Sequence, residues 1–327
     1  MSRIVLAGNV NVDSVKMLSQ WPERGRLVNV SDVRRSVGGC VSNSGIDLKI
    51  LDPSVSVGAI ARIGADEPGE FARATLDAHG IETDGLMTVE GLGTATVDCL
   101  TVEGAGDRTF LFAKGAGATL VPDDIDVSKL DCGIFHLGYL LLLDGLDAVD
   151  EEYGTKAARL LAKVQAAGIR TSIDVVSEQS DRFQRIVKPA LRYCDYVVIN
   201  EVEASLATGV PETDMRGMCE ALMACGVRER AVVHCPAKSA SLDADGRYSE
   251  LGSLMLPEGW IVGSTGAGDA FCAGMLLSFL RGMDAADGLR LASCAAACNL
   301  SVADSISGAK SAEESLLLDK RFGRRPT

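Results

Sequence analysis

A repeated order of amphipathic helix, glycine and short apolar run constrains the fold of this chain more than any other feature. Segments 70–79, 156–167 and 215–225 have apolar residues at helical spacing, and each stops at a glycine. Glycine accepts the left-handed conformation that commonly ends a helix. Apolar runs at 171–176 and 231–235 follow the second and third helices and are typical of parallel strands buried on both faces. The pattern predicts a doubly wound α/β sheet, mostly parallel, with helices on both faces.

Two extended segments interrupt this order. Residues 27–37 and 94–113 mix polar with apolar positions, as half-buried strands do, and the second contains a turn rich in glycine. Antiparallel strands inserted in such a chain commonly form a flap where ligands bind, beyond the carboxyl ends of the parallel strands. We therefore expect one domain over residues 1–327, with lid segments at approximately 11–38 and 93–116.

The charge and composition of the chain limit its partners. It has 32 Lys and Arg against 45 Asp and Glu, a net charge of −13, and 5% aromatic residues. These values do not suit nucleic acid, which needs a basic face or stacked aromatic rings. No apolar run approaches the ~20 residues of a membrane span. The ten cysteines form no C-x-x-C pair, so we expect a cytoplasmic protein with reduced thiols, no nucleic-acid or membrane partner and no structural zinc.

The sharpest local motif is a loop of small residues, 263–268, followed by Asp269 and an apolar helix at 270–280. The first amides of a helix have no internal partner, and the helix dipole adds about half a positive charge there. Such a loop binds anions, most often phosphate. Asp269 would repel a phosphate unless it takes the proton of a hydroxyl that attacks it. The alternative is that Asp269 only caps the helix.

Two common nucleotide sites are excluded by the sequence. It contains no G-x-x-x-x-G-K-[ST] loop, and the first strand leads into Gly8-Asn9-Val10-Asn11-Val12-Asp13 rather than G-x-G-x-x-G. A P-loop and a Rossmann dinucleotide site are therefore not expected.

Taken in chain order, the motifs resemble the ribokinase-like (PfkB) carbohydrate kinase family. The matching positions are Asn11 and Asp13, Gly38-Gly39 with Asn43, Arg108-Thr109-Phe110, Asn200 with Glu203, and Gly266-Ala267-Gly268-Asp269. The resemblance covers essentially the whole chain. It implies ATP-dependent phosphorylation of a hydroxyl on a small sugar or sugar derivative. A nucleoside kinase of the same fold and a non-catalytic sugar- or nucleoside-binding homologue remain open.

The resemblance also implies roles for these residues at the phosphoryl end of the site. Asp269 is expected to be the general base, with the amides of Gly266, Ala267 and Gly268 as the anion hole. Asn200 and Glu203 match an N-x-x-E motif that organises Mg²⁺ and the nucleotide phosphates, and Glu203 is expected to hold the ion through water. Thr265, Gly268 and Ser293 are expected to contact the nucleotide.

At the acceptor end, the resemblance implies that the substrate is held by Asn11, Asp13, Gly39, Asn43 and Arg108. Asp accepts from two hydroxyls, Asn both donates and accepts, and Gly lets a ligand approach the backbone. Further cations on the lid segments, Arg34, Arg35 and Lys114, suit an anionic acceptor, although an ordinary solvated charged face explains them as well.

Two departures from the family pattern limit what is carried over. Gly263-Ser264-Thr265 stands where the family usually has Asp-Thr, so activation by a monovalent cation is left undecided. Pro236 follows the strand at 231–235 where a glycine-containing loop is usual, so contacts to the ribose and adenine must differ.

Exposed strand edges tend to pair with a second chain, so a homodimer through the lid is expected. The last residues, 321–327, are expected to be frayed.

Overall fold

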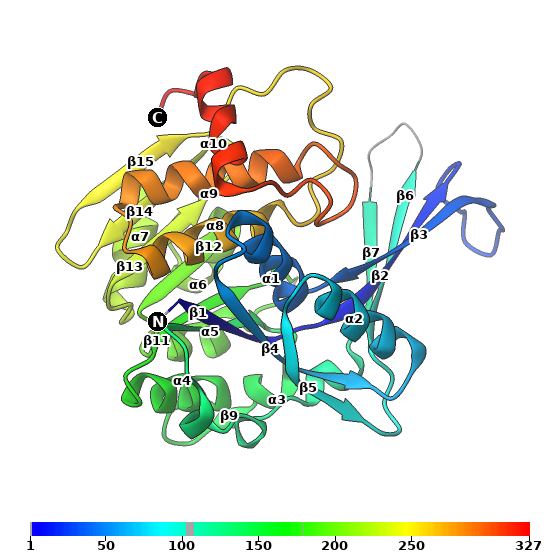
Figure 1. Cartoon of the computed structure of the whole chain (residues 1–327), viewed down its shortest axis with the longest axis horizontal. Helices are drawn as coiled ribbons and strands as arrows, with labels where there is room; N and C mark the ends of the chain where they lie inside the picture. The colour runs from blue at the N-terminus through cyan, green and yellow to red at the C-terminus, as the bar shows by residue number, and fades with distance from the viewer. Residues whose placement is uncertain (1, 103–107, 179) are drawn as a thin grey trace.

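The computed structural model describes residues 2–102, 108–178 and 180–327. A large sheet crosses the molecule (Figure 1). Its strands in chain order are β1 (Arg3–Gly8), β4 (Ser56–Gly64), β5 (Glu82–Val89), β8 (Ile134–Leu140), β11 (Arg170–Val175), β12 (Tyr196–Asn200), β13 (Arg230–His234), β14 (Lys238–Asp243) and β15 (Tyr248–Gly252). The spatial order is β15-β14-β13-β12-β11-β8-β1-β4-β5, parallel from β5 to β13 and antiparallel beyond. The predicted α/β class is confirmed.

Helices cover both faces of the large sheet. One layer contains α1 (Cys40–Leu51), α2 (Glu67–Ala78), α8 (Ala267–Arg281), α9 (Ala285–Asn299) and α10 (Ala312–Arg321). The other contains α4 (Lys156–Ala166), α5 (Phe183–Leu191), α6 (Glu201–Thr208) and α7 (Met215–Ala224). Within β1, Ile4 and Leu6 pack in the first layer's core, and Val5 and Ala7 in the second's. Alternation into two buried faces explains why these strands are apolar throughout.

A second, four-stranded sheet projects from one side of the molecule (Figure 1). Its strands are β2 (Asn11–Leu18), β3 (Val30–Gly38), β6 (Ala95–Val102) and β7 (Arg108–Ala113), in the order β3-β2-β6-β7. We call it the small sheet. The expected strands are present, but β2 and β6 run parallel, so an entirely antiparallel flap was a wrong expectation. Both strands follow carboxyl ends of large-sheet strands, β1 and β5, and therefore leave in the same direction. The expected turn at 103–107 lies outside the described residues.

The helix boundaries follow the predicted glycines closely. Gly80, Gly168 and Gly226 end three helices with φ of 72°, 81° and 121°. Helix α2 begins earlier than expected because Asp66 accepts a hydrogen bond from the Gly69 amide at 3.0 Å and caps it.

The last residues are ordered rather than frayed. Arg324 pairs with Asp319 at 2.5 Å, donates to the Gly252 carbonyl at 2.9 Å and forms a β-bridge with Leu254. The prediction of a frayed tail was wrong because charge spacing in the last helix does not reveal a partner 72 residues away.

Three 3-10 helices, η1 (Gly115–Thr119), η2 (Pro122–Asp124) and η3 (Val127–Lys129), and two further short elements complete the described structure. Helix α3 (Asp144–Asp147) precedes a hairpin of β9 (Val149–Asp150) and β10 (Gly154–Thr155). All ten cysteines are free thiols. None of the described helices combines the length and apolar character that crossing a membrane requires.

Candidate active site

Asp269 lies in the first turn of α8 with its side chain buried. Its Oδ2 accepts a hydrogen bond from Asn43 Nδ2 at 2.9 Å, and its Oδ1 accepts one from the Tyr139 hydroxyl at 2.5 Å. Burial raises the pKa of Asp269, while the hydrogen bonds from Tyr139 and Asn43 oppose the rise. The carboxyl group is therefore held in one orientation and is more basic than an exposed aspartate, as a proton acceptor requires.

Gly266, which precedes α8, adopts a conformation that requires glycine. Its φ is 78°, and a Cβ at this position would lie 2.4 Å from the Ser305 carbonyl oxygen. Asn299, at the end of α9, donates from Nδ2 to the carbonyls of Gly266 at 3.2 Å and Ser305 at 2.6 Å. The tight approach of residue 305 and the Asn299 amide together fix the loop that opens α8.

The amides predicted to form an anion hole are not equivalent. The Ala267 amide donates to the Ser264 carbonyl at 3.3 Å, so it is engaged within the loop. Gly268 occupies the second position of α8, where an amide has no acceptor in the helix ladder, and it has no side chain to block a ligand. The structure thus modifies the predicted hole: Ala267 must release Ser264 or share its hydrogen to contribute.

Asn11 and Asp13 meet Gly38 where β2 and β3 pair. Asn11 Nδ2 donates to Asp13 Oδ1 at 2.5 Å. A Cβ on Gly38 would lie 2.5 Å from both of these atoms, and Gly39, which caps α1, has a φ of 87°. Burial, together with the charge of Asp269, raises the pKa of Asp13 to about 7, and the Asn11 hydrogen bond opposes the rise. The Gly-Gly pair therefore makes room for two polar groups near Asp269.

Asn200 and Glu203 form a capping box at the start of α6. Asn200 Oδ1 accepts from the Glu203 amide at 2.9 Å, and Glu203 Oε2 accepts from the Asn200 amide at 3.0 Å. Ser177 Oγ donates to Glu203 Oε1 at 2.7 Å. Burial raises the pKa of Glu203 to about 7. The pair stabilises its own helix. It also places a buried carboxyl group at the carboxyl end of β12, and this group has no cationic partner in the described chain.

His234 lies between the N-x-x-E segment and the first turn of α8. It ends β13 opposite Asn200 in the parallel register, and a Cβ on Gly268 would lie 3.9 Å from His234 Cε1. Its ring packs on Phe271 with centroids 4.6 Å apart. Burial lowers the pKa of His234 to about 4, so the imidazole is neutral at pH 7.

A cavity of about 610 Å³ lies between the small sheet, α2 and residues 303–307. Asp13, Arg34, Arg35 and Thr265 supply part of its polar lining. Most of the remaining lining is apolar, namely Val15, Met17, Val37, Phe71, Cys99, Val102, Phe110, Val262, Ala303 and Ile306. Asp269 is not part of this lining, and the cavity is related to it through Asp13, whose pKa the charge of Asp269 helps to raise.

Three of the cations predicted on the lid segments, Arg34, Arg35 and Lys114, each have an acidic partner. Arg35 pairs with Glu67 at 2.5 Å and lies over the Phe71 ring at 4.3 Å from its centroid. Arg34 pairs with Asp32 at 2.7 Å. Lys114 pairs with Asp144 at 2.6 Å and is not part of the cavity lining.

Ser293, Thr265 and Arg108 were also predicted to contact the ligands. Ser293 lies in α9 six residues before Asn299, roughly 9 Å along the axis; its hydroxyl donates to the Arg290 carbonyl and accepts from Arg324 at 3.0 Å. The tail residue Arg324 therefore contacts Ser293 directly. Thr265 lies in the loop before α8 and lines the cavity. Arg108 begins β7, and its side chain lies outside the described residues.

Asn43 and Tyr139 show what sequence reasoning missed. Asn43 was predicted to bind the acceptor, but its amide holds Asp269 and its Oδ1 accepts from Ser305 Oγ at 3.0 Å. Tyr139 was not among the site residues predicted from the sequence. A tyrosine near the end of a buried parallel strand was the available signal, but its partner lies 130 residues away.

Comparison with known proteins agrees with this geometry. The family model described as pfkB family carbohydrate kinase matches residues 1–312. The chain belongs to the PfkB family. It is 24% identical over 311 residues to a ribokinase of Arabidopsis thaliana (93% of this chain and 77% of the relative). It is 25% identical over 303 residues to an ATP-dependent ribose-1-phosphate kinase of Halopiger xanaduensis (91% of each).

Solved structures show the same fold. The structure of Arabidopsis thaliana ribokinase complexed with ribose and ATP superimposes with a TM-score of 0.78 at 21% identity, covering 96% of this chain and 97% of that one. This PfkB protein is therefore a kinase of the carbohydrate or nucleoside type. Its acceptor and the roles of its residues are matters for proposal.

Proposed function

We propose that this PfkB protein transfers the γ-phosphoryl group of ATP to a hydroxyl of a small sugar or sugar derivative bound in the cavity beside Asp13. The observation that carries the proposal is the buried Asp269 carboxyl group, which Asn43 and Tyr139 hold at the N-terminus of α8, next to Gly266. We call this N-terminus the mouth of α8. This arrangement combines a proton acceptor with a site for negative charge.

The proposed reaction is a direct in-line transfer. Asp269 takes the proton of the acceptor hydroxyl as its oxygen attacks the γ-phosphorus, the bond from phosphorus to the bridging oxygen breaks, and ADP leaves with that oxygen. The amides of Gly266 and Gly268, with the α8 dipole, stabilise charge on the phosphoryl oxygens. Ala267 joins them once its bond to Ser264 opens. Neutral His234, beside Gly268, is placed to donate to a phosphate oxygen.

Glu203 fits a role in holding Mg²⁺ through water. Both of its oxygens already accept hydrogen bonds, from Ser177 and from the Asn200 amide, which suits an outer contact to a hydrated ion better than direct ligation. Burial without a cation raises its pKa to about 7, and a nearby divalent ion would restore the ionised form. The ion, when bound, neutralises charge on the nucleotide phosphates.

A nucleoside is the second candidate for the acceptor. The cavity lining that favours it is apolar and aromatic, with Phe71 and Phe110 on two of its walls and Ile306 on another. A free sugar presents mainly hydroxyls, whereas a nucleoside adds a flat base that packs against such rings. Asp13 and Asn11 would hold the sugar in either case.

The small sheet is the proposed surface for a homodimer. Val33, Phe110 and Leu111 on its outer strands are 60%, 55% and 56% exposed. Exposed apolar side chains on edge strands favour pairing with a second copy. Light scattering should give twice the chain mass of 34.3 kDa. A monomeric mass at micromolar concentration would contradict the dimer and leave the kinase proposal intact.

The decisive test is an ADP-release screen with Mg²⁺ and ATP across pentoses, hexoses, sugar phosphates, sugar acids and nucleosides. We expect acceptor-dependent ADP release in one of these classes and a phosphorylated product of matching mass. Calorimetry with Mg²⁺ and ATP runs in parallel. If the folded protein gives no heat at millimolar ATP and no product with any acceptor, it is a non-catalytic binding homologue instead.

A further inference from the structure

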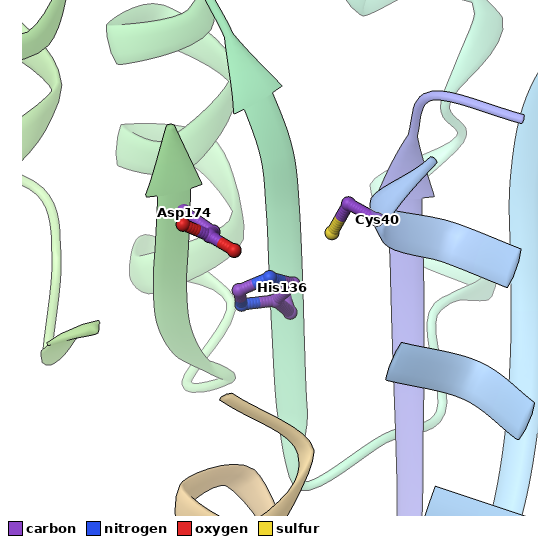
Figure 2. Close-up of side chains that lie close together, drawn as sticks. All are labelled: Cys40, His136 and Asp174. Atoms are coloured by element: carbon purple, nitrogen blue, oxygen red, sulfur yellow. The ribbon is translucent and has the colours of Figure 1, made fainter. Parts of the chain in front are cut away.

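Four potential metal ligands lie near one another in the buried core, and the proposed kinase reaction does not use them. Cys40 begins α1, His136 lies in the middle of β8 and Asp174 lies near the end of β11. Their ligand atoms all lie within 4.8 Å of one another. Figure 2 shows the three side chains converging from three separate elements. All three are buried.

Cys272 in α8 completes the group. Its Sγ lies 3.9 Å from His136 Nε2, and it too is buried. The other ring nitrogen, Nδ1 of His136, lies 3.1 Å from Ser172 Oγ. Metal-binding histidines usually hydrogen-bond through the nitrogen that does not face the metal. The imidazole is therefore oriented with Nε2 towards the thiol.

Among the described residues, the hydrogen bonds of the cluster bring no positive charge to it. Asp174 Oδ1 accepts only from the amide of the next residue, Val175, at 2.7 Å. Within the described part of the chain, no Lys or Arg side chain hydrogen-bonds or pairs with Cys40, His136, Asp174 or Cys272. Burial raises the pKa of the two thiols and of Asp174 and lowers that of His136. A bound cation would compensate burial of the ionised groups.

We propose that Cys40, His136, Asp174 and Cys272 bind one Zn²⁺ ion per chain. Zinc takes thiolate, imidazole and carboxylate ligands in a tetrahedron, whose ligand atoms lie roughly 3.5 Å apart. To reach this geometry, the ligand atoms of Cys40, His136 and Asp174, now within 4.8 Å of one another, must approach by roughly 1 Å. Cys272 Sγ, which is not one of that three-residue group, must also move towards Cys40 and Asp174. Two soft thiolates and an imidazole select zinc over the hard Mg²⁺. Binding releases the protons of both thiols and of any protonated carboxyl group.

This proposal departs from the expectation of no structural zinc, and it does not depend on the kinase proposal. That expectation rested on the absence of C-x-x-C pairs and the small number of histidines. Here the four ligands come from α1, β8, β11 and α8, so no local spacing reveals them. The ion would join α1 to α8 one residue after Gly39 and one helical turn after Asp269. Zinc should therefore raise the melting temperature.

The test is metal analysis of the full chain from zinc-supplemented cells, with elemental mass spectrometry and X-ray absorption at the zinc edge. We expect about one zinc per chain, ligated by two sulfurs and two lighter atoms. Protein grown with cobalt should show thiolate-to-cobalt absorption. Cys40→Ala and Cys272→Ala should each lose at least tenfold of the bound metal, while Cys219→Ala, a buried thiol elsewhere, keeps it.

Two results would overturn the proposal. One is wild-type protein with less than a tenth of an equivalent of zinc and no cobalt absorption. The other is a full equivalent without sulfur ligands, or one retained by both cysteine variants, because the metal would then lie elsewhere. The absorption spectrum of wild-type protein decides the ligands even if the variants do not fold.

Discussion

The mouth of α8 and the cavity under the small sheet differ in how they are built. At the mouth of α8, a contiguous segment supplies the base and the amides, and buried hydrogen bonds from Asn43, Tyr139 and Asn299 hold it. The cavity is assembled from side chains on four strands, a helix and two loops, several of them exposed. Under the proposed function, the first region admits few substitutions and suits one constant reaction. The second region would tolerate change and select the acceptor.

The largest expected effect is at the mouth of α8. Asp269→Asn removes the proton acceptor while keeping the shape and the hydrogen-bond acceptor for Tyr139. We expect kcat to fall by a factor on the order of 10²–10⁴ with little change in the KM for ATP. Steady-state kinetics measure this. Asp47→Asn is the matched control, because Asp47 is a buried carboxyl group of α1 whose pKa the charge of Asp269 raises. A similar loss of kcat in this control would mean that general structural damage, not loss of the base, explains the result.

The next effect is on the cavity side. In Gly38→Ala, the new Cβ would lie 2.5 Å from Asn11 Nδ2 and Asp13 Oδ1, so both side chains must move. We expect the KM for the acceptor to rise by on the order of tenfold or more, with a smaller change in kcat. In the control Gly117→Ala, the nearest atom to the new Cβ is 3.8 Å away. Equal KM values in the two variants would show that the Asn11–Asp13 pair does not bind the acceptor.

A smaller effect separates positioning from proton transfer at the mouth of α8. Tyr139→Phe removes a hydrogen bond that lowers the pKa of Asp269, so that pKa should rise further. The base is then protonated at higher pH, and the acid limb of the kcat profile should move up by about one unit. Activity at pH 6 falls more than activity at pH 8. Tyr193→Phe, far from the site, should leave the profile in place; a uniform loss at every pH would refute the role assigned to Tyr139.

The smallest effect concerns stability on the cavity side. The pKa of Asp13 is raised to about 7 in the folded chain, above the value near 4 in the unfolded chain. Between these values the folded state binds more protons, so the stability contributed by Asp13 falls as pH rises from about 4 to about 7. Asp13→Asn should raise the melting temperature at pH 8 more than at pH 5, measured by calorimetry without ligand. An equal shift at both pH values would show that Asp13 titrates normally.

Much of the fold was predictable because its signals are local. Glycines at 80, 168 and 226 end helices through their own φ angles, and apolar runs form strands that need no particular partner to be recognised. The Gly266–Asp269 loop and the capping pair Asn200 and Glu203 are local for the same reason. The contact of the tail with Ser293 and the parallel pairing of β2 with β6 depend on distant segments. The predictions of a frayed tail and of an entirely antiparallel flap failed for this reason.

The sequence alone determined which segments become helices and strands, and where a glycine-containing loop and a carboxyl group come together at one helix. These properties depend on neighbours within a few residues, through backbone angles and the unpaired amides of a first turn. Only the tertiary structure decided that Tyr139 and Asn43 hold Asp269, that the cavity wall is aromatic, and that Cys40, His136, Asp174 and Cys272 converge. Those contacts join residues from different elements, and side-chain packing across the sheet, which no local spacing encodes, brings them together.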